Sequence, residues 1–253
     1  MTPASRARLL AALCSLAVSA ARASGGPPMF TDDPGTPGNG NWEINVAAVS
    51  SHADGVSSHQ LPLVDANYGV SDRLQLKLEM PWQLQQQPGG AYQGGAGNAL
   101  AGVKWRFYDG GEKAWQVSTY PQIEFRTPLS NLNHNDLADH GVSRLLPLEF
   151  VRGFEGFDIN FDVGRWFRPA DQVDTWIGGV AVTREVKQGF ELIAEIHDER
   201  ATHTSADELL LNFGARYDFS PRYTLLLSAG RDLHNSLGSR NTLLSYVGLQ
   251  IHY

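Results

Sequence analysis

The chain has 253 residues, a formal net charge of −7 and a mean hydropathy of −0.27. Its length suits one large domain or two small ones, and its acidic balance argues against nucleic-acid binding, which requires a basic surface. The single cysteine, Cys14, lies near the N-terminus, so we expect neither a disulfide framework nor thiol chemistry in the rest of the chain.

Residues 1–23 have the features of a secretory signal peptide. Arg6 and Arg8 precede an apolar run from Leu9 to Ala21, and Ala21-Arg22-Ala23 is a cleavage site of the A-x-A type. The alternative is a buried helix. We expect cleavage before Ser24 and export of the mature chain, which then contains no cysteine.

Residues 24–41 are rich in glycine and proline, and we expect them to form an irregular segment in the periplasm. Asp32 and Asp33 precede Pro34 within this segment. Two neighbouring carboxylates could hold a cation, or they could accept backbone hydrogen bonds in a turn before the proline. We favour the turn.

Residues 42–253 alternate between apolar and polar side chains along short stretches, most clearly from Arg73 to Trp82. A period of two predicts β-strands, because successive side chains on a strand point to opposite faces. Pro147 lacks a backbone donor and predicts a bulge or irregularity in the sixth stretch. We expect about twelve strands, within Trp42–Ala48, Val64–Val70, Arg73–Trp82, Ala101–Phe107, Trp115–Phe125, Arg144–Val151, Phe157–Val163, Trp176–Val182, Phe190–His197, Glu208–Asp218, Tyr223–Ala229 and Leu243–Tyr253.

The connections between these stretches alternate in length. Short turns follow every second stretch, whereas long loops are expected at Ser50–His59, Gln83–Gly97 and Arg126–Ser143, with a flexible extracellular part at Gly89–Gly97. Aromatic residues gather near the strand ends, as they do at membrane interfaces. These features predict an all-β fold, a transmembrane antiparallel up-and-down β-barrel of about 12 strands at residues 42–253, in contact with outer-membrane lipid. A secreted β-sandwich is the main alternative.

The final stretch ends on an aromatic residue. Val247, Leu249, Ile251 and Tyr253 share one of its faces. This arrangement resembles the closing strand of bacterial outer-membrane barrels, in which a terminal aromatic with alternating apolar residues is the assembly signal. We therefore expect the barrel-assembly machinery to recognise these four residues.

Motifs along nearly the whole mature chain are similar to those of one known family. They read FTDDPGTPGNGNWEIN at 30–45, NYGVSDRLQLKLEMPW at 67–82, GNALAGVKWRF at 97–107, YPQIEF at 120–125, AEIH at 194–197, NFGARYDFS at 212–220 and LLLSAGRDLH at 225–234. Together they resemble the outer-membrane transporters grouped as the phenol-degradation meta-pathway family. The resemblance implies a barrel that passes small compounds, often aromatic or apolar, across the outer membrane. It carries over no particular substrate.

On each strand the face opposite the apolar residues is charged. If the apolar residues face lipid, the charged face lines the lumen, because ions within a membrane need water or partners. Basic residues gather on the third and fourth stretches and acidic residues on the seventh, ninth and tenth. This arrangement predicts a transverse field suited to a polar or zwitterionic solute. The predicted solute pathway consists of Arg73, Lys77, Glu79, Lys104, Arg106, Glu124, Asp158, Asp162, Glu191, Glu195, His197, Glu208 and Arg216.

We therefore predict an outer-membrane channel or transporter for small molecules. A barrel of about twelve strands has only a modest interior, so the same charges could instead pair across it and hold it shut. That alternative is a structural or adhesive barrel with a closed lumen.

An enzyme is a further alternative, since some small barrels hydrolyse or transfer lipid acyl groups. His197 lies near mid-strand with Glu195 and Glu199 on the same face, but the spacing supplies no nucleophile beside it. The other histidines lie mostly in expected loops without a metal-ligand spacing, as His134 and His140 illustrate. We predict no enzymatic activity, no metal and no cofactor.

Overall fold

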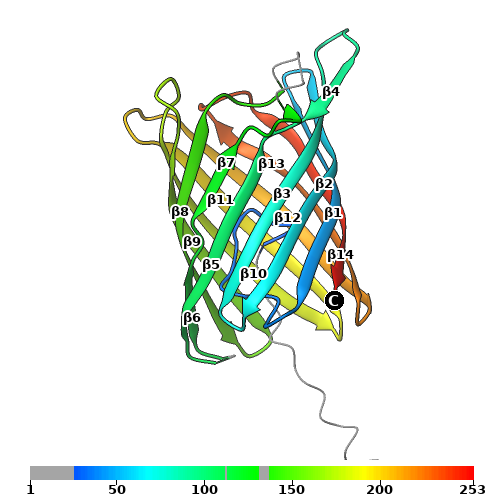
Figure 1. The fold of residues 1–253 in the computed structure, drawn as a ribbon, viewed down its shortest axis with the longest axis vertical. Coiled ribbons are helices and arrows are strands. Elements are labelled where there is room, and N and C mark those ends of the chain that lie inside the picture. Colours follow the sequence, from blue (N-terminus) through cyan, green and yellow to red (C-terminus); the bar gives the residue numbers. More distant parts are fainter. Residues whose placement is uncertain (1–25, 112, 131–136) are drawn as a thin grey trace, which may run out of the picture.

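Strands β1 (Trp42–Ala53) and β14 (Asn241–His252) pair antiparallel from Glu43↔His252 to Ala53↔Asn241, and this pairing closes the sheet into a barrel. The computed structural model describes residues 26–111, 113–130 and 137–253 (Figure 1). The predicted signal peptide lies outside the described residues and stays a prediction. Within the described residues, no helix has the length and apolar character needed to cross a membrane.

The barrel wall contains twelve strands in antiparallel order, which confirms the predicted fold class. The strand β6 and the strand β7 are two parts of one wall strand, and β4 prolongs the wall strand β5 beyond the rim. The remaining bounds are β2 (Val56–Ser71), β3 (Leu74–Gln86), β4 (Tyr92–Ala96), β5 (Ala99–Asp109), β6 (Trp115–Thr119), β7 (Gln122–Phe125), β8 (Val142–Phe154), β9 (Phe157–Phe167), β10 (Thr175–Lys187), β11 (Phe190–Ala201), β12 (Asp207–Ser220) and β13 (Tyr223–Asn235).

The interruption between β6 and β7 falls at Tyr120 and Pro121, because the proline has no N–H for the ladder. The register against β5 is the same on both sides of the gap. Pro147 of β8 lies opposite this gap, and the register of β8 against β9 is unbroken through it. The irregularity predicted at Pro147 is therefore found in the strand formed by β6 and β7, which is interrupted opposite Pro147. The pairing of β8 with β9 is regular.

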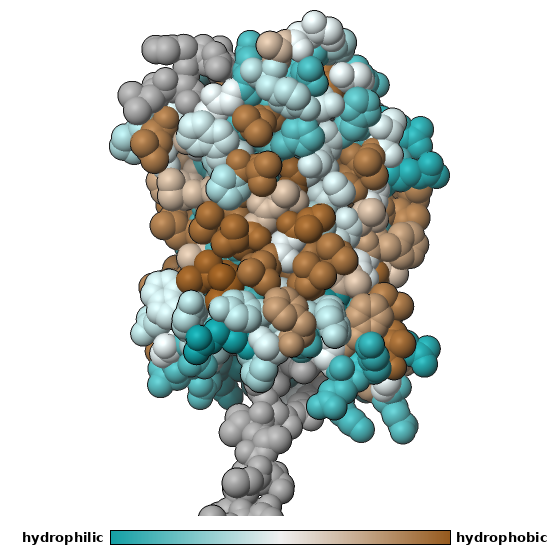
Figure 2. All heavy atoms as spheres, turned by 90° about the vertical axis from the view of Figure 1, so that its right-hand side faces the viewer, coloured by the Kyte–Doolittle hydropathy of each residue, from teal (hydrophilic) through white to brown (hydrophobic). Residues whose placement is uncertain are grey.

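Apolar side chains form a belt around the outside of the barrel. Leu78, Trp105 and Phe213 are 47%, 54% and 57% exposed, although each lies in the middle of a wall strand. Figure 2 shows the belt at mid-height, between two hydrophilic ends. A contiguous exposed apolar band of this kind is typical of a surface covered by lipid.

The long loops predicted at Ser50–His59 and Gln83–Gly97 are wrong in large part, because strands continue through them. The strands β1 and β2 meet at a two-residue turn, Asp54-Gly55, whose φ angles of 49° and 81° are those of a type I′ hairpin. The strand β3 extends to Gln86 and pairs there with β4, where a flexible loop was expected; this hairpin rises above the wall in Figure 1. The third predicted loop includes residues 131–136, which lie outside the described residues.

We expected residues 24–41 to form an irregular segment in the periplasm. The structure contradicts this for most of the described part, residues 26–41. Its first part, residues 26–37 (the inner segment), enters the lumen, where it is visible in blue behind the front wall in Figure 1. Both ends of the inner segment lie near the rim with the short turns. Gly26 accepts a hydrogen bond from Arg216, four residues before the end of β12, and Thr36 donates to Asp72 in the β2–β3 turn. The inner segment is therefore a loop inserted from this rim.

Candidate solute pathway in the barrel lumen

The side chains that face the lumen are mainly polar, and many of them are buried at mid-height. Asn45, Glu149, Asn160, Glu195 and Asn212 come from five different wall strands, and each is at most 2% exposed. Opposite walls and the inner segment cover them. A soluble barrel of this size would fill the same space with apolar side chains, so the polar filling is a property that function has to explain.

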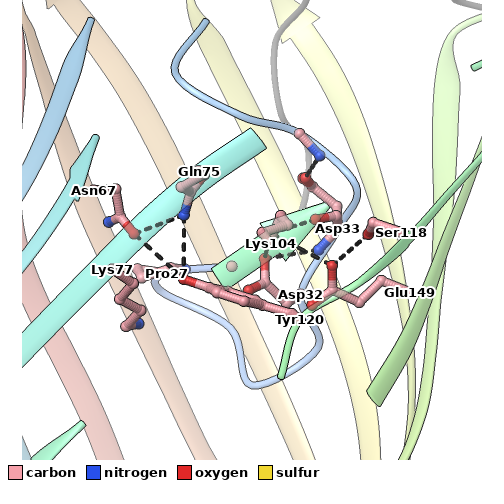
Figure 3. Close-up of polar contacts among 12 residues, drawn as sticks. Pro27, Asp32, Asp33, Asn67, Gln75, Lys77, Lys104, Ser118, Tyr120 and Glu149 are labelled. Atoms are coloured by element: carbon pink, nitrogen blue, oxygen red, sulfur yellow. Dashed lines mark hydrogen bonds and ion pairs between the residues drawn. The ribbon is translucent and has the colours of Figure 1, made fainter. Parts of the chain in front are cut away.

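Lys104 of β5 is the centre of one buried cluster (Figure 3). Its Nζ lies 2.9 Å from Asp32 Oδ1 of the inner segment and 3.5 Å from Glu149 Oε2 of β8, and it also donates to the Asp33 carbonyl oxygen. Ser118 Oγ donates to Glu149 Oε2 at 2.6 Å. The Tyr120 ring centroid lies 4.6 Å from the Lys104 ammonium. The inner segment thus supplies part of the compensation that a buried lysine requires.

A second cluster on β2 and β3 adjoins the first. Lys77 Nζ lies 3.3 Å from Asp65 Oδ1 and 2.9 Å from Glu79 Oε2. Gln75 Nε2 donates to Asn67 Oδ1 at 2.7 Å and to the Tyr120 hydroxyl at 3.2 Å, which links the two clusters (Figure 3). Acids therefore compensate both lysines at close range, which weakens the predicted transverse field.

The opposite wall holds the backbone of the inner segment. Glu195 accepts the Thr31 N–H at 2.5 Å through Oε1 and the Asn212 side chain at 3.1 Å through Oε2. Arg216 Nη2 donates to the carbonyl oxygens of Gly26 and Pro27 at 3.1 and 3.0 Å. These contacts bind the backbone of the inner segment rather than its side chains.

Glycines on the wall provide the space for the inner segment. A β-carbon on Gly179 of β10 would lie 2.1 Å from Thr31 Oγ1, and one on Gly69 of β2 would lie 1.9 Å from the Gly38 carbonyl oxygen. Gly179 cannot carry a side chain while the inner segment is docked, and Gly69 cannot carry one beside Gly38, the residue that follows the segment. Met29 packs in a small apolar cluster with Ala181 and Ile193, and a β-carbon on Gly214 would lie 2.0 Å from its methyl carbon.

The structure brings most of the predicted pathway residues to the lumen, but not all to one place. The prediction that Arg73 lines the pathway is wrong, because Arg73 lies exposed in the turn between β2 and β3 rather than on a wall strand. Arg106 lies near the short-turn rim, where it donates to the Asp72 carbonyl oxygen at 2.7 Å. Glu124 and Glu208 lie toward the opposite rim, bonded to Asn98 and Asn235. Asp158 and Glu191 are the second residues of β9 and β11, at the short-turn rim. The remaining members lie farther along their strands: Lys77, Glu79, Lys104, Asp162, Glu195, His197 and Arg216.

Sequence reasoning omitted several inward residues that contribute to these clusters. Glu149 alternates with Leu148 and Phe150, so the period of two was sufficient to place it in the lumen. Asp32 and Thr31 had no such signal, because the inner segment has no periodicity. Asp33 does accept the Gly35 N–H at 2.5 Å, as expected of a turn, while Asp32 pairs with Lys104.

His197, the residue considered for catalysis, has its ring centroid 5.7 Å from that of Phe30 on the inner segment. Among the residues that the structure describes, no group of three or more histidine, cysteine, aspartate or glutamate side chains is placed to hold a metal ion.

A closed twelve-stranded barrel with an apolar belt outside and a polar lumen defines a transmembrane up-and-down β-barrel. No family model matches this sequence. The search of curated proteins also gives no match. The resemblance to the meta-pathway family therefore stays a prediction.

Several solved structures of outer-membrane barrels are similar to this chain. An outer-membrane channel from Pseudomonas putida F1 has a TM-score of 0.70 and 14% identity, over 90% of this chain and 99% of that chain. The NanC porin has a TM-score of 0.59 and 8% identity, over 82% and 98%. The translocator domain of the autotransporter NalP from Neisseria meningitidis has a TM-score of 0.55 and 11% identity, over 83% and 87%. At these identities the likeness concerns the fold alone.

Proposed function

We propose that this chain is an outer-membrane channel for small solutes, exported by its signal peptide, in which the inner segment controls passage through the lumen. The observation that carries this proposal is the composition of the lumen filling. Part of it is a separate loop, held to the wall through its backbone and through side chains that include Asp32, paired with Lys104, and Thr36, which donates to Asp72. A loop held in this way can leave without unfolding the wall.

The class of solute rests on two further considerations. The resemblance to the meta-pathway family favours small compounds that include aromatic or apolar ones. The polar wall favours solutes that also carry hydrogen-bonding or charged groups, because an apolar lining would otherwise be expected. The similar solved structures include a channel and a porin, which agrees with passage of solutes.

The test measures single-channel conductance in planar bilayers and solute uptake into liposomes by the refolded protein. We expect low conductance from the full chain and a clear increase after deletion of residues 26–37. Glu195→Ala removes the acceptor of the Thr31 N–H, so it should increase conductance in the same direction. Arg184→Ala, which removes an exposed side chain on the same outward face of β10 as Val182, is the comparison. Unchanged conductance and uptake in the deletion variant would contradict the proposal.

A closed structural barrel is the second candidate, favoured by the close pairing of Lys77 and Lys104 with acids. In that case deleting the inner segment should lower stability and leave conductance at the baseline. A third measurement addresses the enzyme alternative. Phospholipase turnover by the refolded barrel, lost in His197→Ala, would contradict our proposal that the chain is not an enzyme.

A further inference from the structure

A hollow of about 430 Å³ lies at the mouth of the barrel opposite the short turns. Three loops surround it: those between β9 and β10, β11 and β12, and β13 and β14. Thr175, Glu199 and Ala201 bound it from the inward face of the wall, since their neighbours Trp176 and Arg200 are exposed on the other face. The lining also includes Arg168, Val173, Ala206 and Leu237.

An ion pair forms one side of this hollow. Arg168 Nη2 lies 2.9 Å from Glu199 Oε1, and Thr175 Oγ1 donates to the same oxygen at 2.5 Å. The Arg168 guanidinium carbon lies 5.3 Å from the centroid of the Trp166 ring, which is a cation–π contact that helps to orient Arg168. Each partner of the pair is 24% exposed. Both charges are therefore oriented by the protein and remain accessible.

The loop that carries Arg168 is fixed by Asp174. Its Oδ1 accepts the Arg168 backbone N–H and its Oδ2 accepts Arg165 Nη2, both at 2.9 Å. The Asp174 carbonyl oxygen accepts the Thr202 N–H at 2.9 Å, which joins this loop to the next. The hydrogen bonds from Arg168 and Arg165 hold the pKa of Asp174 below its usual range. The ion pair thus belongs to a pre-organised site.

The hollow lies next to the lumen. Glu199 is two residues beyond His197 on the same face of β11, about 7 Å along the strand. His197 contacts Phe30 of the inner segment, and Phe30 is 54% exposed although it points away from lipid. A solute held in the hollow would therefore lie directly above the tip of the inner segment.

We propose that this hollow binds a small zwitterion with an apolar side chain, such as an apolar α-amino acid; this assignment rests on the proposed channel function. The reason is charge matching at an existing ion pair. A carboxylate alone competes with Glu199 for Arg168, and an amine alone competes with Arg168 for Glu199. A zwitterion brings both charges and replaces one ion pair with two. Val173, Ala206 and Leu237 provide apolar contact for the side chain.

The test is isothermal titration of the refolded full chain in detergent with three probes of similar shape: L-leucine, 4-methylpentanoate and 3-methylbutylamine. We expect leucine to bind at least tenfold more tightly than either singly charged probe. Arg168→Gln and Glu199→Gln should each weaken leucine binding at least tenfold. Arg200→Gln is the matched control, because Arg200 is 60% exposed, pairs with acids only at 3.7 and 3.8 Å, and does not line the hollow.

Equal binding of the three probes, or leucine binding that survives Arg168→Gln, would overturn the assignment. Thr175→Val is a second variant in case the charge variants do not refold, and it should weaken leucine binding by loosening Glu199. The two proposals fail differently. Leucine binding without conductance or uptake would retain the site and refute the channel, whereas conductance without leucine binding would do the reverse.

Discussion

The close approach of Gly179 to the inner segment allows a sharp test of how that segment is held. A β-carbon at Gly179 would lie 2.1 Å from Thr31 Oγ1 and 2.5 Å from Asp162 Oδ1, whereas ordinary van der Waals contact begins at 3.4 Å. In Gly179→Ala, Thr31 must therefore move by more than 1 Å or leave. Thr31 also donates its N–H to Glu195, so this displacement breaks a hydrogen bond that holds the tip.

Overpacking of this size costs about 1–3 kcal/mol. The clash with Thr31 exists in the docked state alone, whereas the clash with Asp162 of β9 is present in both states, so the ratio of docked to undocked segment should decrease by at most roughly 5- to 150-fold. Hydrogen exchange measured by mass spectrometry on the peptide covering residues 26–37 reports this ratio directly. We expect exchange in Gly179→Ala to accelerate within that range, accompanied by higher single-channel conductance.

The adjacent Gly178 supplies the control. It faces the other side of β10, and its nearest neighbour to an added β-carbon is the Asp162 carbonyl oxygen at 3.9 Å. Gly178→Ala should leave exchange of the segment unchanged. Equal exchange in Gly179→Ala and wild type, or equal acceleration in both variants, would refute the idea that wall glycines admit the segment.

Three other predictions concern the buried cation, the outer loop and the closing strand. Lys104→Met leaves Asp32 and Glu149 without their shared cation, and should lower the free energy of unfolding in urea by about 3–5 kcal/mol; exposed Lys113→Met should change it by less than about 0.5 kcal/mol. Asp174 has a depressed pKa, so its hydrogen bonds stabilise the β9–β10 loop above the ordinary carboxyl pKa and are lost as pH falls through the depressed value. Exchange protection of residues 168–174, corrected for intrinsic rates, should thus decrease in acid in wild type, and should be low and independent of pH in Asp174→Asn. Deletion of Tyr253 removes the backbone pair with Trp42, in which each N–H donates to the other carbonyl oxygen at 3.0 Å, and should reduce outer-membrane levels of the protein. Normal surface levels of that variant would contradict the role predicted for the terminal residue.

The wall of the barrel could be predicted because each strand contains its own signal. A period of two placed Leu78 toward lipid and Lys77 toward the lumen without knowledge of any partner strand. The strand ends were less predictable. Residues 56–59 and 83–86 are polar except for Val56 and Leu84, and they are all half-buried without an alternation of faces, so their sequence indicates loops.

The inner segment could not be predicted from sequence, for a different physical reason. Its position depends on backbone hydrogen bonds to Glu195 and Arg216, more than 160 residues away, and on space left at Gly179. A segment rich in glycine and proline has no periodicity that would indicate burial. Asp32 was noticed, but its partner Lys104 is joined to it only by the fold.

The connection of the inner segment to a single rim has a consequence for the order of assembly. Since both of its ends lie near the short turns, residues 26–37 enter and leave the ring of strands on the same side. Closure between β1 and β14 can therefore come first and docking of the loop second, and the two events are topologically independent. A barrel inserted with an empty interior is on this account a competent intermediate that the loop can still complete, rather than a kinetic trap.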